Sequence, residues 1–242
     1  MAERLDRPME KTPMEKQKVF NPVSPFLVVL VAAMVLVELI LQAAEWGLIG
    51  GPEAIGWRLD LARDFGFHKA VFEHLLVGGV IEPKVIWPFF SYIFVHQSFA
   101  HMVVAAALIL GMGKMISDRF SGTSVLVLFF GCGVMGALAF GVFSTSGGFP
   151  LIGAYPVFYG FIGTYTWISV AALRKQQKNI LPAFNVVGLL LLFRGAFALV
   201  YGLSNSWSAD LAGLITGFLL AYILGPEGKA RIKSWINAAR NR

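Results

Sequence analysis

The sequence predicts an all-α membrane protein, a bundle of six transmembrane helices with a long external first loop, and three observations carry the prediction. Of the 242 residues, 57% are hydrophobic and only 14% are charged, whereas a soluble domain carries roughly 25% charged residues. Six apolar runs are each long enough to cross about 30 Å of hydrocarbon as a helix. Each run must satisfy its own backbone hydrogen bonds in lipid, which favours helices over open strands.

The predicted spans each contain about 20 residues and few charges. They cover residues 25–45, 92–114, 123–143, 151–172, 182–203 and 207–224. Between the first two spans, residues 45–88 mix charges with apolar residues at helical spacing, so we expect a long external loop with one or two interfacial amphipathic helices. The expected organisation is a polar tail at 1–22, a membrane domain at 23–225 and a basic tail at 226–242.

Lysine and arginine residues gather at the chain ends and in the connections near 114–122 and 173–180. The connections at 144–150 and 204–206 carry no charge. This alternation places both termini in the cytoplasm, and we expect a multi-pass protein of a bacterial inner membrane. The net charge of +6 is then explained by membrane anchoring, so no nucleic-acid partner is expected.

Cysteine and glycine usage limits the further possibilities. The single Cys132 excludes disulfides within the chain and cysteine-based metal sites. No cofactor or metal is expected. Four glycines of the third span permit either internal packing or self-association, namely Gly131, Gly133, Gly136 and Gly141. The expected partners are the lipid bilayer and other transmembrane proteins.

The segment FVHQSFAHM places His96 and His101 at the start of the second span. Imidazole is the usual proton-transfer group near neutral pH. Two histidines five residues apart do not share a helical face, which speaks against a metal pair. We therefore expect interfacial histidines with capping and solvent partners, with an active role as the alternative.

The segment PLIGAYPVFYGFIG enters the fourth span. Pro156 suits the first turn of a helix, which puts Tyr155 at the helix N-terminus. Gly153, Gly160 and Gly163 permit close approach of another helix. Taken alone, Tyr155 is interpreted as a residue of the interfacial aromatic belt.

The segment SWSADLAGLITG opens the sixth span with Asp210, followed by the small-residue pair Gly213 and Gly217. A carboxylate suits the positive N-terminal end of a helix, so capping is the simplest role for Asp210. The glycine pair is typical of close helix packing in membranes.

Arg194 lies in the middle of the fifth span. A cation at that depth needs a partner inside the bundle. The candidate partners are Asp210, Asp118, a backbone carbonyl, Glu38 and Glu45. We favour a fixed interhelical pair over a role in transport.

The chain resembles the rhomboid family of intramembrane serine proteases in the order and spacing of three segments, FVHQSFAHM, PLIGAYPVFYGFIG and SWSADLAGLITG. Family members carry a His-x-x-x-Asn pattern early in the second span, Gly-x-Ser-Gly at the fourth and Ala-His-x-Gly-Gly-x-x-x-Gly at the sixth. The resemblance covers residues 87–225, and the first span with its long helical loop also looks like the family's. It implies the rhomboid bundle with a lateral opening toward lipid.

Carried over position by position, the resemblance implies that the catalytic residues are missing. The nucleophilic serine falls on Tyr155, the following glycine on Pro156 and the general-base histidine on Asp210, while Ala105 stands in place of the oxyanion asparagine. Only His101 is retained. Because a carboxylate is a poor base for a phenol, no dyad chemistry is expected. A hydrogen bond from the Tyr155 hydroxyl to the Asp210 carboxylate is predicted instead.

Three functions follow as hypotheses. The first is a rhomboid-like pseudoprotease that binds or stabilises other membrane proteins without cleaving them, in client binding, quality control or as a complex subunit. The second is an active intramembrane serine endopeptidase that uses Ser146 with His101 or His96 as its base. The third is a small transporter or ion pathway built on Asp210 and Arg194.

Overall fold

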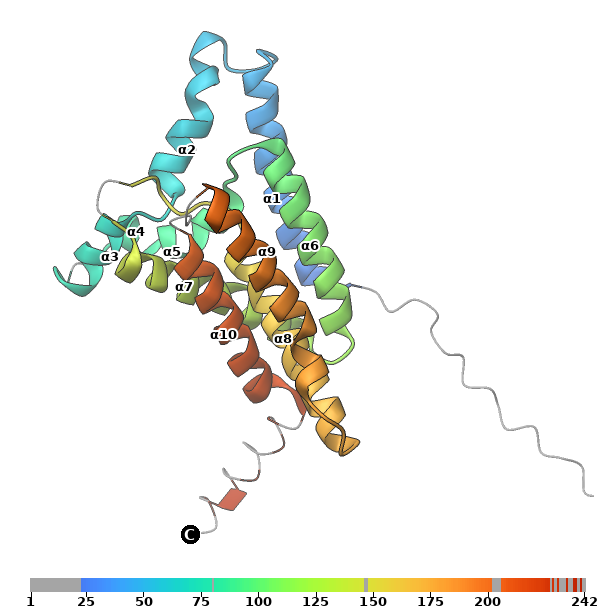
Figure 1. Cartoon of the computed structure of the whole chain (residues 1–242). Coiled ribbons are helices and arrows are strands. Elements are labelled where there is room, and N and C mark those ends of the chain that lie inside the picture. The colour runs from blue at the N-terminus through green and yellow to red at the C-terminus, as the bar shows by residue number, and fades with distance from the viewer. Residues whose placement is uncertain are drawn as a thin grey trace, which may run out of the picture.

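The computed structural model describes residues 23–79, 81–145, 148–201 and 206–226, together with 228, 230, 234, 237, 238 and 240. Six helices within these ranges are long and apolar enough to cross a membrane. They are α1 (Pro25–Glu45), α6 (Phe99–Ser117), α7 (Gly122–Phe143), α8 (Tyr155–Lys175), α9 (Asn185–Tyr201) and α10 (Trp207–Leu224), and they form the bundle of Figure 1. The predicted all-α six-span architecture is confirmed. The predicted tail at 1–22 lies outside the described residues, as does most of the tail at 226–242.

Three predicted spans, the second, the fourth and the fifth, begin later than expected. The second begins at Phe99 rather than 92, because α5 (Pro88–Ser91) and the turn η2 (Tyr92–Phe94) precede an extended stretch that ends at Ser98. The hydroxyl of Ser98 accepts a hydrogen bond from the His101 N–H at 3.2 Å and so caps the helix. The fourth begins at Tyr155 rather than 151. The fifth is preceded by the turn η3 (Leu181–Phe184).

The first loop folds into the turn η1 (Pro52–Gly56) and the helices α2 (Trp57–Phe65), α3 (Lys69–Leu76) and α4 (Pro83–Ile86), followed by α5. The helices α2 and α3 are the amphipathic pair that the sequence predicts. Figure 1 shows α2 rising beside the upper end of α1. Phe67, between α2 and α3, is fully buried and forms an isolated antiparallel bridge with Leu151. The loop is thereby joined to the segment that precedes α8.

A partly buried ion cluster anchors this loop to α1. The guanidinium of Arg58 on α2 donates to both oxygens of Glu38, at 2.8 and 3.0 Å, and also to Glu45. A further N–H of Arg58 donates to the backbone carbonyl of His96 at 2.9 Å. Burial alone would lower the pKa of Arg58, but the hydrogen bonds to Glu38 and Glu45 raise it above its ordinary value. Glu38 and Glu45, considered above as partners of Arg194, are therefore partners of Arg58.

The contact between α8 and α10 is the most extensive in the bundle. Gly217 lies directly against the backbone carbonyl of Gly160, and Gly213 lies against that of Pro156. The hydroxyl of Thr164 donates to the carbonyls of Gly160 and Gly217, at 3.0 and 3.1 Å. Small residues thus let two backbones approach closely, as membrane helices commonly do.

The four glycines of α7 face neighbours within the chain. A Cβ atom on Gly133 would meet Ile93, and one on Gly136 would meet Pro156. Gly131 faces Leu220 and Gly141 faces Phe72. Their positions are accounted for by internal packing, without a second copy of the chain.

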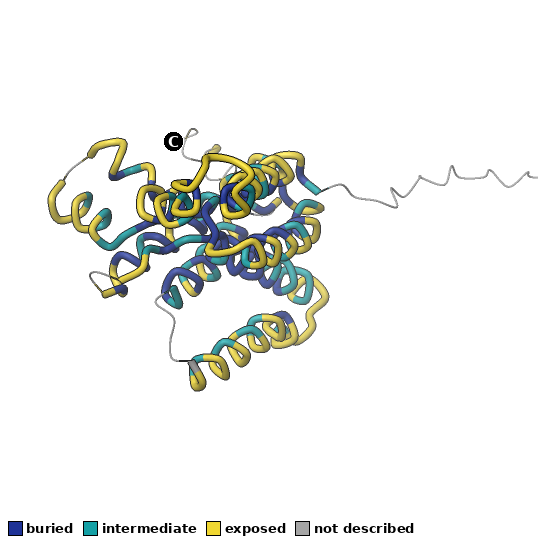
Figure 2. Tube along the Cα trace, turned by 90° about the horizontal axis from the view of Figure 1, so that it is seen from above, coloured by how far each residue is buried: buried dark blue, intermediate teal, exposed yellow. Residues whose placement is uncertain are grey.

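By contrast, α9 stands apart from the other spans. In Figure 2 it is the mostly exposed helix at the lower edge of the view. Only 6% of the apolar 18-residue stretch of this span is buried, against 61% of the corresponding stretch of α8. A single stripe of half-buried residues faces the bundle, formed by Val187, Leu190, Arg194 and Ala198. Most of the surface of α9 is therefore left to contact lipid.

Candidate functional site

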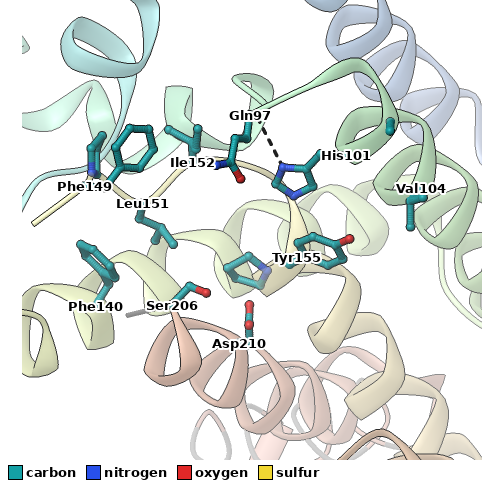
Figure 3. Close-up of a pocket in the computed structure, with 13 residues that line it drawn as sticks. Gln97, His101, Val104, Phe140, Phe149, Leu151, Ile152, Tyr155, Ser206 and Asp210 are labelled. Atoms are coloured by element: carbon teal, nitrogen blue, oxygen red, sulfur yellow. Dashed lines mark hydrogen bonds between the residues drawn. The ribbon is translucent and has the colours of Figure 1, made fainter. Parts of the chain in front are cut away.

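A cavity of about 640 Å³ lies at the end of the bundle where α6, α8 and α10 begin. Figure 3 shows the residues that line the cavity, which include predicted site residues and their neighbours. The described wall includes Gln97, His101, Val104, Leu151, Tyr155, Pro156, Ser206 and Asp210. Three of the positions singled out from the sequence, at 101, 155 and 210, are thus brought together.

His101 and Tyr155 are held together by ring stacking. Their ring centroids lie 4.9 Å apart with an interplanar angle of 21°. Gly153 makes room for this arrangement, because its φ of +94° favours glycine and a Cβ atom there would lie 3.0 Å from the imidazole. The Gln97 N–H donates to Nδ1 of His101 at 3.4 Å. The imidazole is therefore positioned by backbone and aromatic contacts.

His96 lies inside the protein and not in solvent, so the expectation of solvent and capping partners for it was wrong. Its residue is fully buried, and neither ring nitrogen makes a hydrogen bond of normal geometry to any described residue. The ring packs edge-on against His101, with centroids 5.3 Å apart. Burial, followed by the neighbouring His101, lowers the pKa of His96 to about 3. The cap of α6 comes from Ser98 instead.

This burial predicts a loss of stability in mild acid. The unfolded chain takes up a proton on His96 near pH 6.5, whereas the folded chain resists protonation down to about pH 3. Stability should therefore fall as the pH drops below 6.5, by about 2 kcal/mol at pH 5. Thermal unfolding in detergent at pH 7 and pH 5 measures the loss, which His96→Phe should reduce. A His96→Phe protein with undiminished acid sensitivity would contradict the assignment.

Asp210 forms an ion pair with Arg194 across α9 and α10. Its Oδ2 accepts a hydrogen bond from Nη1 of Arg194 at 2.5 Å, and the Asp210 residue is only 2% exposed. The same Nη1 donates to the hydroxyl of Tyr159 at 3.3 Å, and the guanidinium lies 5.7 Å from the centre of that ring. The fixed interhelical pair is present, with Asp210 as the partner of Arg194.

The predicted hydrogen bond between Tyr155 and Asp210 was wrong. In the described part of the chain, Oδ1 of Asp210 has no hydrogen-bond partner and Oδ2 is bound to Arg194. Figure 3 shows the Tyr155 hydroxyl directed toward Val104 and away from Asp210. Stacking on His101 fixes the phenol ring in this direction. The Asp210 carboxylate is paired with Arg194 instead, and a serine protease dyad requires no such arginine.

Among the described residues, no serine hydroxyl is paired with a histidine base in the way a hydrolytic site requires. A serine nucleophile requires a base within hydrogen-bonding distance and donors that meet the oxyanion. Nε2 of His101 has no hydrogen-bond partner among the described residues, serine hydroxyls included. Ser146, the alternative nucleophile, lies outside the described residues. No group of three or more metal-ligating side chains occurs in the described segments.

Sequence reasoning missed two features that shape this site. Arg58 fixes the backbone at His96, next to the cavity wall, from 38 residues away. Tyr159 supports the guanidinium of Arg194 from the first turns of α8. Only the mixture of charges with apolar residues in the first loop pointed toward Arg58, and no local pattern marked Tyr159.

The geometry defines a polytopic membrane protein with a cavity at one end of its helix bundle, lined by apolar side chains and by His101, Tyr155 and Asp210. A family model described as the Rhomboid domain matches residues 83–227, which is more than half of the chain. The chain therefore belongs to the rhomboid family, which is made up of intramembrane serine proteases. No curated protein matches the chain.

Proposed function

We propose that this protein is a rhomboid-like pseudoprotease that binds or stabilises other membrane proteins without cleaving them. The observation that carries the proposal is the Arg194–Asp210 ion pair at the position where the family places its general base. A carboxylate held by an arginine is a poor acceptor for a nucleophile's proton. Tyr155, at the nucleophile position, stacks its ring on His101, and its hydroxyl points toward Val104 and away from Asp210.

The cavity supports a binding role for the same region. It extends along α6 as far as Val104, whose side chain is 47% exposed on a membrane-spanning helix. A partner embedded in the bilayer therefore has access to its rim. We further propose that both termini face the cytoplasm of a bacterial inner membrane, since lysine and arginine residues gather at the ends and at alternate connections.

A transport pathway built on Asp210 and Arg194 is less well supported. The two charges form one ion pair and neutralise each other, which gives no separate charged site for a passing ion. A proteolytic role for Ser146 rests on the sequence alone. We therefore retain client binding as the proposed function.

Reconstitution with a transmembrane reporter tests the proposal. We expect no cleavage above the level of the Ser146→Ala and His101→Ala variants, while an active family member cleaves the same reporter. In parallel, purification from mild detergent should recover transmembrane proteins that an unrelated six-span protein does not recover. Wild-type cleavage that either variant abolishes would overturn the proposal.

A further inference from the structure

Another pocket lies at the opposite end of the bundle from the cavity, where α6 and α10 end and α7 begins. In Figure 1 this is the lower end of the molecule. A space of about 130 Å³ is bounded there by the connection from α6 to α7, the second half of α8 and the end of α10. Its wall includes Arg119, Phe120, Trp167, Tyr222 and Gly225. The pocket therefore lies where apolar spans give way to polar connections.

Aromatic rings build the apolar wall of this pocket. The indole of Trp167 on α8 packs edge-on against Tyr222 and Phe218 of α10, with ring centroids 5.0 and 5.3 Å away. Phe120 is buried and fixes the residues next to it against the bundle. Tryptophan and tyrosine favour the headgroup level of a bilayer, so their presence here places the pocket at that depth.

Arg119 supplies the positive charge of the pocket wall. Its side chain is exposed and makes no hydrogen bond or ion pair with any residue in the described part of the chain. By contrast, Arg58, Arg63 and Arg194 each donate to a carboxylate. A guanidinium at a pocket without an acidic partner is available to an anion from outside the chain.

The connections at this end of the bundle add to the positive charge. Residues 114–122 and 173–180 hold the basic residues Lys114, Arg119, Arg174, Lys175 and Lys178, and the single acid Asp118. This is the end that we propose faces the cytoplasm, where the membrane leaflet carries anionic lipids. Basic pockets between transmembrane helices on that side are suited to phospholipid headgroups.

The volume of the pocket restricts the kind of anion. About 130 Å³ is well below the roughly 300–1,000 Å³ of a site for a drug-sized ligand, so only a small group fits. A phosphate matches Arg119 in shape as well as charge, because a guanidinium can donate two parallel N–H bonds to two of its oxygens. Ile168 and Ala171 give the pocket an apolar side that suits the beginning of an acyl chain.

From this combination we propose that the pocket binds the phosphate of an anionic phospholipid. Arg119 is the anion-binding residue, and Trp167 with Tyr222 forms the aromatic wall. The site is separate from the cavity at the other end of the bundle and does not depend on the proposed function.

Native mass spectrometry of the full chain in detergent tests the site. Phosphatidylglycerol and phosphatidylcholine with the same acyl chains are titrated separately, because only the first has a net negative charge. Arg119→Gln removes the guanidinium from the pocket. Arg174→Gln is the matched control, since Arg174 is an exposed arginine at the same end of the molecule but does not line the pocket. Without added lipid, both variants should melt at the temperature of the wild type.

We expect the wild type to bind one phosphatidylglycerol several-fold more tightly than phosphatidylcholine. Arg119→Gln should weaken the binding of phosphatidylglycerol about tenfold, the size of one charge-assisted hydrogen bond. Arg174→Gln should change it less than about twofold, because an exposed charge outside the pocket contributes little. Equal losses in the two variants would overturn the site, since the lipid would then respond only to the general positive charge. Equal wild-type affinities for the two lipids would overturn it as well.

Inorganic phosphate distinguishes a lipid headgroup from a free anion. It shares the phosphate chemistry but lacks the glycerol and the acyl chains, so it should not displace phosphatidylglycerol when both are present at the same concentration. Displacement under those conditions, lost in Arg119→Gln, would show that the pocket binds free phosphate, and the lipid assignment would fail.

Discussion

Replacement of Arg194 by methionine should destabilise the protein by about 3–5 kcal/mol, the cost of breaking a buried ion pair from one side. The remaining Asp210 carboxylate is only 2% exposed and would lose the one hydrogen-bond donor that it has among the described residues. Water cannot replace that donor readily within the bundle. The free energy of unfolding, measured by steric trapping or denaturant titration in detergent, reports the loss.

A double-mutant cycle separates the ion pair from the packing of its side chains. Asp210→Leu alone should cost less than Arg194→Met, because the Arg194 side chain is 25% exposed and keeps the hydroxyl of Tyr159. The double variant should return close to wild-type stability, since apolar replacement of a buried pair is often neutral or better. Additive losses in the double variant would show that the two residues do not interact. Arg63→Met, at an exposed pair with Asp60, is the control and should change stability little.

The sequence predicted the bounds of a helix best where its apolar run is long and uninterrupted. The predicted bounds of the first and sixth spans, 25–45 and 207–224, are those of α1 and α10. Unbroken apolar runs with clear flanks define such helices by themselves. The starts of α6 and α8 were missed because each depends on a contact made by folding. Ser98 caps α6 after an extended turn, and Leu151 is drawn into a bridge with Phe67 from the first loop.

The composition of the candidate site followed from the family resemblance, whereas its connectivity did not. Tyr155, Asp210 and His101 do line one cavity. Which of them touch is decided by helix rotation and by the reach of side chains from other helices. The Asp210 carboxylate binds Arg194, and the ring of Tyr155 stacks on His101. The sequence offered Asp210 as one of several candidate partners for Arg194, but it contained no local signal that chose among them or that predicted the stacking of Tyr155 on His101.

The close contact of α8 with α10 should be the least tolerant of change. A Cβ atom added at Gly217 would overlap the backbone carbonyl of Gly160, and a backbone cannot rotate aside as a side chain can. The two helices would have to separate, with loss of the Thr164 hydrogen bonds to both glycine carbonyls. Gly217→Ala should therefore cost about 3 kcal/mol, at the upper end of ordinary overpacking, and Gly217→Leu should prevent folding.

Thermal unfolding and the yield of monodisperse protein in detergent measure this effect. Gly111→Ala supplies the matched control, since Gly111 is also a mid-span glycine but a Cβ atom there meets nothing within 4 Å. That substitution should be neutral or slightly stabilising, because alanine is the better helix former. If Gly217→Ala behaves like Gly111→Ala, α8 and α10 cannot be in backbone contact. The position of Asp210 opposite Tyr155 would then lose its support, because the α8–α10 contact brings both residues to the cavity wall.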